Sequence, residues 1–554
     1  MIKIELPKRD EIFSLKEEAY KDKTLEEIVD ENFKGEKILG AVLSGKVVNL
    51  DYIPQDGDLI KLVDIRNSIG LRLYTNSLIM IFRMAERKLF PNRLSIIDAF
   101  IGSTIYVEEE SGGYHYEDIK AIDLEMKNII ASDYKIESEK YLKGEMLDLF
   151  KDEPDKIKLI NTADIKSEYL YRINEFVDRF DGELVNRTGL IDNYNLKYYY
   201  PGLLIEFPSA SNDFDTKNEV EQPSLSKVFH DEHKFAKRIG VKYVGDLNEK
   251  ILNKDVRELI LVSESYMDDK IRQAAYEILN DPVKKIVLIS GPSSSGKTTT
   301  AQKLKVALLK HGIKTVEIST DDYFVDREKT PRKPNGEYDF ESIDAVDVHQ
   351  LNSDIMKLIE FGEVDKMTFD FMEGKSIKTG EKYHLGDKDI IIIEGIHALN
   401  PKLSQELPER NKFKIYLSAL TTMNIDALNR LSTTDVRFLR RMVRDVRTRG
   451  RNVSSSLDEW KNVRAGEDKY VFPYQEMADL TINTSLIYEI AIIKKHAMKL
   501  LEQVPKDDPN FVRVTRLKNM LSLFISIDED ELVPNTSILR EFIGGSIFGS
   551  EYDL

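Results

Sequence analysis

Residues Ile286-Val-Leu-Ile-Ser290 and Gly291-Pro-Ser-Ser-Ser-Gly296-Lys297-Thr298 are the most informative stretch of this 554-residue chain. The second part matches the pattern G-x-x-x-x-G-K-[ST], follows an apolar run of strand length and opens a helical pattern. Glycines let the backbone wrap an anion, and amides at a helix N-terminus point at phosphate oxygens. Lys297 can add positive charge at the β and γ phosphates, and the Thr298 hydroxyl can ligate Mg²⁺. The stretch therefore predicts a strand, a phosphate-binding loop and a helix.

Short apolar runs alternate with helical segments from Val283 onward. This pattern is typical of a parallel sheet covered by helices on both faces. No Asn-Lys-x-Asp motif follows the loop, which argues against a GTPase and leaves motor ATPases and small-molecule kinases open. The expected strands are Ile286–Ser290, Thr315–Ser319, Asp389–Ile393, Phe413–Leu417 and Ala478–Ile482.

Acidic residues follow two of these strands. Asp321 comes shortly after Thr315–Ser319, and Glu394 comes directly after Ile393. The carboxyl ends of parallel strands face the ligand crevice. A carboxylate there can accept a hydroxyl proton during phosphoryl transfer or hold Mg²⁺. We expect Asp321 to act as the base and Glu394 to lie on the metal side; a helix cap or a strand-end turn is the alternative for each.

Arginines are concentrated between positions 437 and 451 of an otherwise acidic chain. Helical spacing places Arg437, Arg441 and Arg444 on one face. Arginine forks suit transferring phosphates and can close over them as a lid, with Gly450 as a hinge. A solvated basic face or an RNA patch is the alternative, and the near absence of interleaved aromatic residues weakens the RNA reading. The cluster comprises Arg437, Arg440, Arg441, Arg444, Arg447, Arg449 and Arg451, with Asp445 as the only acid among them.

Together these segments resemble the uridine kinase branch of the phosphoribulokinase-like P-loop kinases, over about residues 285–485. The resemblance implies ATP and Mg²⁺ as cofactors, with Thr298 and Glu394 at the metal. It implies Asp321, Lys297, Arg441 and Arg444 as catalytic residues. The residues it implies at ATP are Gly291, Ser293, Ser294, Ser295, Gly296, Lys297, Thr298, Thr299, Arg449 and Arg451.

The resemblance implies that the acceptor is bound by Asp344, Phe369 and Arg441. Asp344, in Tyr338-Asp-Phe-Glu-Ser-Ile-Asp344, matches the acid that binds the ribose hydroxyls of a nucleoside. Phe369-Asp370-Phe371 replaces the usual Tyr-Asp-Phe, and Gly374 stands where the uridine and cytidine enzymes place a base-reading histidine. Losing that contact relaxes base selection, so a preference for pyrimidines is not expected.

The N-terminal half carries a second resemblance. Strand, helix and strand patterns in residues 1–65 predict a β-grasp unit similar to the TGS domain of threonyl-tRNA synthetases. Residues 66–215 resemble the second additional, editing-type α+β domain of those enzymes, most clearly at Leu89–Pro91 and Gly113–Tyr116. Alignment puts Asn76 and Met80 at the first histidine pair of the editing site, and the chain has no cysteine for the second pair. We therefore expect a scaffold without tRNA-editing chemistry.

A multidomain protein follows from these segments. The expected division is 1–65, 66–215, a linker and helical connector at 216–282, a kinase domain at 283–500 and a helical extension at 501–554. We further expect a polar linker at about 212–228, helices at Ser77–Phe90, Ile251–Val262 and Asp268–Leu279, and a packing role for the tail Asn535–Phe548.

Composition limits the function classes. The chain has 80 Lys and Arg residues against 97 Asp and Glu residues, a net charge of −17, and no cysteine. The acidity argues against strong nucleic-acid binding, because polyanions need a basic surface. The missing cysteines exclude disulfides, Cys-ligated zinc and thiol catalysis. No run approaches the ~18 apolar residues of a membrane helix, and no signal peptide is recognised. We expect a cytoplasmic protein without a membrane partner, and a homo-oligomer stays open.

The function expected from the sequence is ATP-dependent phosphorylation of the 5′-hydroxyl of a nucleoside. The fusion of TGS-like, editing-like and kinase-like parts is similar to a group of bacterial uridine or nucleoside kinases. Two alternatives remain. One is a kinase for another small hydroxyl compound, such as a sugar phosphate or a pantothenate-like molecule. The other is an RNA- or ribosome-associated regulator that uses ATP binding as a switch.

Overall fold

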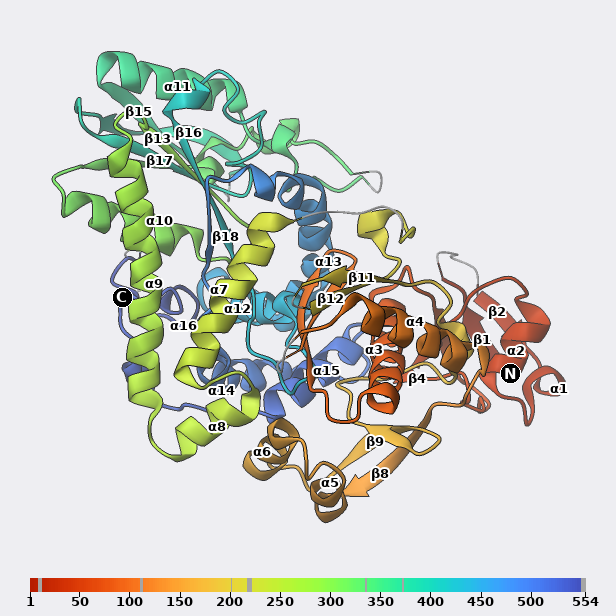
Figure 1. Ribbon diagram of the computed structural model, residues 1–554. Coiled ribbons are helices and arrows are strands. Elements are labelled where there is room, and N and C mark those ends of the chain that lie inside the picture. Colours follow the sequence, from red (N-terminus) through yellow and green to blue (C-terminus); the bar gives the residue numbers. More distant parts are fainter. Residues whose placement is uncertain are drawn as a thin grey trace.

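The computed structural model describes residues 1–7, 12–109, 113–200, 202–216, 222–333, 336–370 and 373–549. Figure 1 shows the N-terminal sheets at the right and the parallel sheet with its helices at the upper left. Phe371, one residue of the predicted acceptor motif, lies outside the described residues.

Residues 1–63 form a five-stranded mixed sheet with a helix packed against it. The strand order is β2-β1-β5-β3-β4, and β1 and β5 are parallel. Thr24 caps α2: its hydroxyl accepts from the Glu27 amide, and the Glu27 carboxylate accepts from the Thr24 amide. A β-grasp unit requires this strand order, and the relationship to TGS domains stays a prediction. The elements are β1 Ile2–Glu5, β2 Ile12–Leu15, α1 Glu17–Tyr20, α2 Leu25–Asn32, β3 Gly40–Leu43, β4 Lys46–Val48 and β5 Leu59–Val63.

The next part of the chain holds two antiparallel sheets, β11-β12-β7-β6 and β10-β9-β8. The helix predicted at Ser77–Phe90 is longer than expected. It begins at Ser68, because the Asn67 side chain caps it by accepting from the Ile69 amide. The elements are α3 Ser68–Leu89, β6 Ser95–Ile101, β7 Thr104–Glu109, α4 Tyr116–Ala131, β8 Glu137–Leu142, α5 Lys143–Leu149, α6 Pro154–Thr162, β9 Ser167–Ile173, β10 Phe176–Asp178, β11 Asn195–Tyr199 and β12 Gly202–Glu206.

Three helices then lead into the parallel sheet: α7 Pro223–Ile239, α8 Val244–Leu252 and α9 Val256–Asn280. Two predictions were wrong here. α7 begins inside the expected linker, and the two helices expected between Ile251 and Leu279 are largely one continuous α9. The polar residue Ser263 does not break this helix, because its hydroxyl donates to the Leu259 carbonyl one turn back, at 2.8 Å.

The predicted parallel α/β sheet is confirmed. Its order is β14-β17-β13-β18-β19, and each neighbouring pair is parallel. In β13, Ile286 and Leu288 face one core cluster and Val287 and Ile289 face another, so helices cover both faces. The elements are β13 Ile286–Ser290, α10 Lys297–Leu309, β14 Thr315–Ser319, α11 Val348–Phe361, β15 Glu363–Asp370, β16 Lys375–His384, β17 Ile390–Glu394, β18 Lys412–Ser418, α12 Thr433–Arg449, α13 Val453–Tyr470, β19 Leu480–Asn483, α14 Glu489–Leu501, α15 Phe511–Ser522 and α16 Arg540–Ile543.

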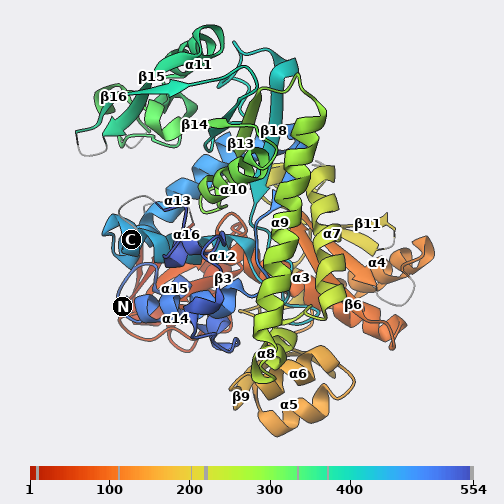
Figure 2. The same ribbon diagram turned by 90° about the vertical axis from the view of Figure 1, so that its left-hand side faces the viewer.

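A two-stranded hairpin, β15–β16, was not predicted. In Figure 2 it lies with α11 at one end of the molecule, far from α5 and α6. Cross-strand ion pairs join Lys378 to Asp365 at 2.7 Å and Lys366 to Glu381 at 3.1 Å. Most of β16 is exposed, so the hairpin lacks the apolar alternation that marks a strand in a sequence.

The loop between β18 and α12 (residues 419–432, the β18–α12 loop) enters the N-terminal half. Asp426 forms an ion pair with Arg179 at 2.9 Å, and the Ile97 amide donates to the Ala427 carbonyl at 2.8 Å. Leu428 belongs to a buried cluster formed mostly by residues between Leu73 and Phe207. The helix that carries the arginine cluster is therefore anchored at its start to the N-terminal half.

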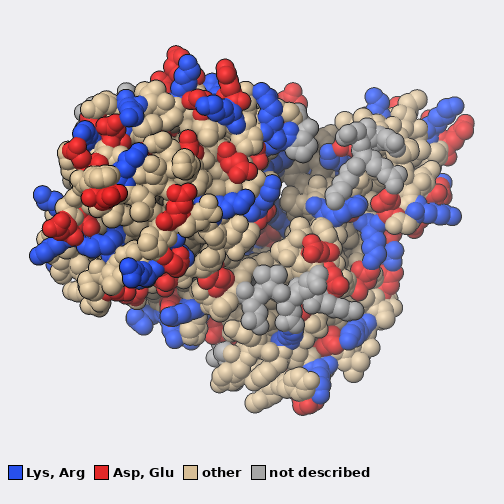
Figure 3. Space-filling view, turned by 90° about the horizontal axis from the view of Figure 1, so that it is seen from above, with Lys and Arg blue, Asp and Glu red and all other residues tan. Residues whose placement is uncertain are grey.

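Basic and acidic side chains alternate over the face seen in Figure 3. Among the described residues, no helix has both the length and the apolar character needed to cross a membrane.

Candidate active site

The phosphate loop has the backbone that its sequence predicts. Gly296 has a φ of +79° and Ser294 a φ of +63°, so the chain turns through the left-handed region before α10 begins. A Cβ on Gly291 would lie 2.4 Å from the Leu417 carbonyl oxygen, so only glycine fits against β18. The Thr484 hydroxyl donates to the Ser295 carbonyl at 2.7 Å, which ties the loop to the segment after β19.

Lys297 lies across the loop. Its ammonium group donates to the carbonyls of Gly291 and Pro292 at 3.0 and 3.3 Å. Burial lowers the pKa of Lys297, and the negative charges of Glu394 and Asp321 work in the opposite direction. The Lys297 cation lies beside loop amides, and such amides can point at phosphate oxygens. This arrangement suits the binding of a nucleoside triphosphate.

The two predicted acids lie at the ends of neighbouring strands. Asp321 lies on the turn after β14, where desolvation by the surrounding protein raises its pKa while the charges of Lys297 and Arg449 oppose the shift. The Glu394 carboxylate accepts from the Thr298 hydroxyl at 3.4 Å and from the Ser319 hydroxyl at 3.3 Å. Burial raises the pKa of Glu394 to about 7. Hydroxyl and carboxylate oxygens are the donors that Mg²⁺ prefers, so this pair fits the metal expected from the sequence.

The predicted acceptor residues lie on three different elements. Asp344 is exposed on a short 3-10 turn, where its amide donates to the Ser342 hydroxyl at 3.3 Å. Phe369 on β15 is 6% exposed and meets Phe324 edge to face, with ring centroids 5.6 Å apart. Gly374 has a φ of +70°, and a Cβ there would lie 2.9 Å from the Arg327 side chain.

Two further groups near Asp344 were missed by the sequence analysis. Burial raises the pKa of Glu341 to about 7 and lowers that of His397 to about 4. Arg441 acts electrostatically on Glu341, and Asp344 acts on His397. Glu341 lies inside the motif that ends at Asp344, which could have singled it out; nothing in the sequence marks His397.

Part of the arginine cluster supports the loop itself. Arg437 pairs with Glu467 and donates to the Ser293 carbonyl at 3.0 Å. Arg440 pairs with Glu489 and donates to the Ser294 carbonyl at 3.2 Å. Both arginines are buried. Because their guanidinium groups are already committed to carboxylates and carbonyls, these two arginines hold the loop against α12.

Of the four predicted lid arginines, Arg441 is buried, whereas the side chains of Arg449 and Arg451 are more exposed. Arg441 donates to the Ser293 hydroxyl at 2.8 Å. Arg444 lies 2.8 Å from Glu541 and 3.5 Å from the Ser294 hydroxyl. Arg449 pairs with Asp445 at 3.1 Å, and Arg451 pairs with Glu459.

Three of the carboxylates that neutralise this cluster come from outside the run of arginines. Glu467 lies on α13, Glu489 opens α14, and Glu541 lies on α16. Glu541 also accepts from the hydroxyl of Thr299, a residue predicted at ATP, at 2.9 Å. Sequence patterns gave no signal for these partners, since each is distant in the chain.

Comparisons with known proteins identify relatives of the part of the chain that holds this site. Residues 286–490 match the Phosphoribulokinase / Uridine kinase family. A uridine kinase of Borrelia duttonii is 30% identical over 228 residues, which cover 39% of this chain and 96% of that protein. A uridine kinase of Lactobacillus helveticus is 26% identical over 215 residues, which cover 39% of this chain and 92% of that protein.

Among solved structures, one described as a possible uridine kinase from Bacillus stearothermophilus is 22% identical and has a TM-score of 0.27. It covers 39% of this chain and 98% of that chain. The sequence relatives support a phosphotransferase with a P-loop nucleotide site. Through residues 286–490, this chain belongs to the phosphoribulokinase/uridine kinase family.

Proposed function

We propose that the chain transfers the γ-phosphoryl group of ATP to a small hydroxyl acceptor, with the 5′-hydroxyl of a nucleoside as the first candidate. One observation carries the proposal. The Asp321 carboxylate lies at the end of β14, close enough to Lys297, Arg444 and Arg449 to interact electrostatically with all three. An acid beside phosphate-binding cations suits phosphoryl transfer.

Asp321 accepts the proton of the attacking hydroxyl as the new O–P bond forms and the bond to ADP breaks. Its raised pKa makes this carboxylate a stronger base than an exposed aspartate. The loop amides and Lys297 hold the β and γ phosphates, and Arg441 and Arg444 neutralise charge on the transferred group. Arg449 and Arg451 close over the nucleotide.

Thr298 and Glu394 are the residues that would hold Mg²⁺, which when bound neutralises charge on the β and γ phosphates. The two side chains already share a 3.4 Å hydrogen bond, so their oxygen atoms converge. Glu394 has to be ionised to act as a ligand.

We place the acceptor beside the exposed Asp344. We propose that Asp344 binds the ribose hydroxyls, that Phe369 contacts the base and that Arg441 approaches the reacting hydroxyl. The Arg327 side chain packs over Gly374, where the uridine and cytidine enzymes place a histidine. This arginine favours a second candidate, an acceptor that carries a negative charge, such as a sugar phosphate.

For the N-terminal half we propose a TGS-like unit (1–65) and an editing-like scaffold (66–215). Met80 is fully buried in one apolar cluster with Phe180 and Leu184, which supports a structural role at the position that aligns with the editing site. The connector (216–282), kinase (283–500) and extension (501–554) complete the proposed division. A cytoplasmic location fits this reading.

Acceptor-dependent release of ADP tests the proposal. The purified chain is incubated with Mg-ATP and a panel of nucleosides, sugar phosphates and other small alcohols, and phosphorus NMR locates the new ester. We expect ADP release with a nucleoside and a product phosphorylated at the 5′ position. Release with only an anionic alcohol would support the second candidate, and release without any acceptor would favour a nucleotide switch.

A further inference from the structure

The C-terminal segment (residues 534–543) packs directly on the phosphate loop. Ser537, Ile538, Leu539 and Phe542 are each at most 1% exposed. A Cβ on Gly296 would lie 2.6 Å from Ile538 Cγ2, so no atom separates the segment from the glycine that opens α10. The predicted packing tail is therefore a wall of the nucleotide site.

Glu541 on this segment joins two elements of the site. One carboxylate oxygen accepts from the Thr299 hydroxyl on α10 at 2.9 Å, and the other lies 2.8 Å from Arg444 Nη1 on α12. The Glu541 and Arg444 side chains are each 17% exposed. A single carboxylate thus bridges the first turn of the phosphate-loop helix and a lid arginine.

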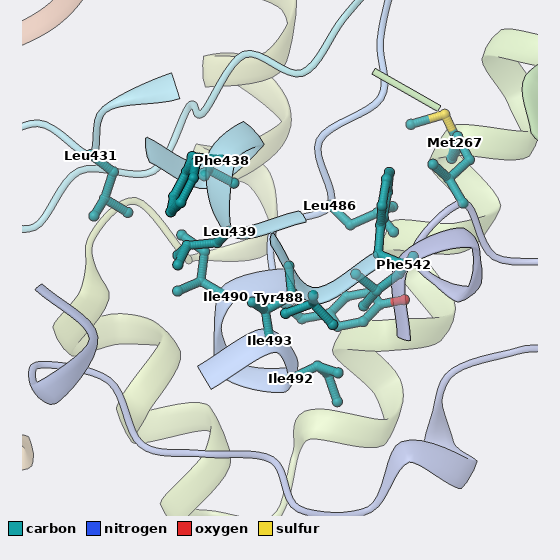
Figure 4. Close-up of a cluster of buried hydrophobic side chains, with 14 of the residues drawn as sticks. Met267, Leu431, Phe438, Leu439, Leu486, Tyr488, Ile490, Ile492, Ile493 and Phe542 are labelled. Atoms are coloured by element: carbon teal, nitrogen blue, oxygen red, sulfur yellow. The ribbon is translucent and has the colours of Figure 1, made fainter. Parts of the chain in front are cut away.

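The segment also fixes the neighbouring guanidinium groups. The Phe542 ring lies 5.1 Å from the Arg440 guanidinium and 5.7 Å from that of Arg444. Arg447 donates to the Glu541 carbonyl at 3.1 Å and to the Phe542 carbonyl at 3.3 Å. Figure 4 shows Phe542 within the same buried cluster as Leu439, Tyr488 and Ile490, so its backbone is firmly held.

The charge on Glu541 acts on the phosphate site. It lies close enough to Lys297 and Glu394 to influence both electrostatically. The Arg444 guanidinium can pair with the Glu541 carboxylate or with the phosphate oxygens of a nucleotide. In addition, the negative charge of Glu541 beside Thr299 repels those phosphates. Nucleotide binding must therefore compete with an ion pair that is already formed.

We propose that Glu541 is a positioning residue, which holds Arg444 at the loop in the nucleotide-free chain and competes with nucleotide phosphates for its guanidinium. The charge on Glu541 then sets the nucleotide affinity. This inference rests on the proposed function in one respect, which is that the loop binds ATP.

Calorimetric titration with Mg-ATP tests the inference on wild type, E541Q, E541D and E531Q. E541Q keeps the shape and removes the charge, and we expect its Kd to fall about 3- to 10-fold at about 50 mM salt. The difference in Kd between wild type and E541Q should close at about 500 mM salt, because screening weakens the repulsion between Glu541 and the phosphates. A purely structural role of Glu541 would not produce this salt dependence.

The other two variants separate charge from geometry. E541D keeps the negative charge on a side chain one methylene shorter, so its Kd for Mg-ATP should stay closer to that of wild type than the Kd of E541Q does. Glu531 is an exposed carboxylate on the preceding stretch, so E531Q should match wild type. Binding by wild type with E541Q equal or weaker would overturn the inference alone. Absence of binding by wild type would overturn the proposed function and the inference with it.

Discussion

Glu394 lies among Lys297, two hydroxyl groups and Asp321, and its protonation state decides whether it can ligate a cation. Burial raises its pKa to about 7, and Lys297 only partly offsets this shift. Below that pH the carboxyl group is mostly neutral, and above it the group is ionised. Metal binding needs the ionised form and releases the proton.

We therefore predict that Mg²⁺ affinity in the presence of ATP rises with pH. Below about pH 7 the rise should approach tenfold per pH unit, and it should level off above that value. Titration of the wild type at several pH values measures the slope. E394Q, which lacks this carboxyl group, should bind weakly and with a shallower pH profile that reflects ATP and the remaining groups; the same slope in E394Q would contradict the assignment.

Arg440 is fully buried and pairs with Glu489 while holding the Ser294 carbonyl. R440M leaves Glu489 buried and unpaired, and we expect it to lower the free energy of unfolding by about 3–5 kcal/mol. The double variant R440M/E489L removes both charges and should recover most of that loss. Denaturant unfolding of the two variants checks this; equal stabilities would show that the ion pair is not what R440M disrupts.

Residues with a local chemical signature could be predicted from the sequence. Asp321 and Glu394 follow apolar strands, and the arginine cluster is dense enough to stand out. Glu467, Glu489 and Glu541 could not be predicted, because each meets its arginine through the tertiary fold. The sequence therefore located the cations of the site and the local anion Asp445, but not the three distant carboxylates that neutralise the cluster.

At the scale of elements, the strands of the parallel sheet were predicted to within a few residues, because they are buried, β-branched and bounded by turns. The hairpin β15–β16 was missed since most of β16 is exposed and polar, while its apolar contacts come mainly from β15. The start of α3 was missed because the helix continues N-terminal to its apolar stripe as far as the Asn67 cap. Hydrophobic periodicity reports burial, and it reveals neither an exposed strand nor a polar helix cap.

The contact between the loop and the C-terminal segment gives a prediction at this scale. Gly296 and Gly312 both have a φ of +79°, but only Gly296 has a neighbour, Ile538, within reach of a Cβ. G312A should lose about 1–2 kcal/mol of stability from backbone strain alone. G296A should lose more and should also bind Mg-ATP more weakly.

The variant I538A separates the causes of the G296A defect. It removes Cγ2 but also destabilises the protein by itself, because it empties a buried site. The loss in G296A/I538A should therefore be smaller than the sum of the losses in G296A and I538A. Thermal unfolding and Mg-ATP titration of the four variants give the comparison. Equal losses in G296A and G312A would contradict the placement of Ile538 against the loop.

For the molecule as a whole, the N-terminal half and the kinase share buried residues. Asp426 of the β18–α12 loop is fully buried, accepts from the Leu428 and Asn429 amides, and pairs with Arg179. The domain boundaries predicted from the sequence divide the chain between 215 and 283. Composition and periodicity could not show that a kinase loop crosses this division.

We predict that the full chain unfolds in a single calorimetric transition, because the two halves share one buried interface. D426A leaves Arg179 with Glu168 as its remaining ionic partner and removes the acceptor for two loop amides. The free energy of unfolding of this variant should fall by about 3–5 kcal/mol, and calorimetry should show two separated unfolding transitions. Two transitions in the wild type would contradict the coupling.

The central claim is phosphoryl transfer with Asp321 as the base, and one comparison tests it most directly. Acceptor-dependent ADP release is measured for wild type, D321N and the control D326N, with Mg-ATP affinity determined in parallel. Asp326 is an aspartate on the same stretch after β14 and pairs with Lys329 at 3.0 Å. We predict that D326N matches wild type. D321N should keep its affinity for Mg-ATP and lose at least about a hundredfold in turnover. Turnover by D321N at the wild-type rate would contradict the assignment of Asp321 as the base.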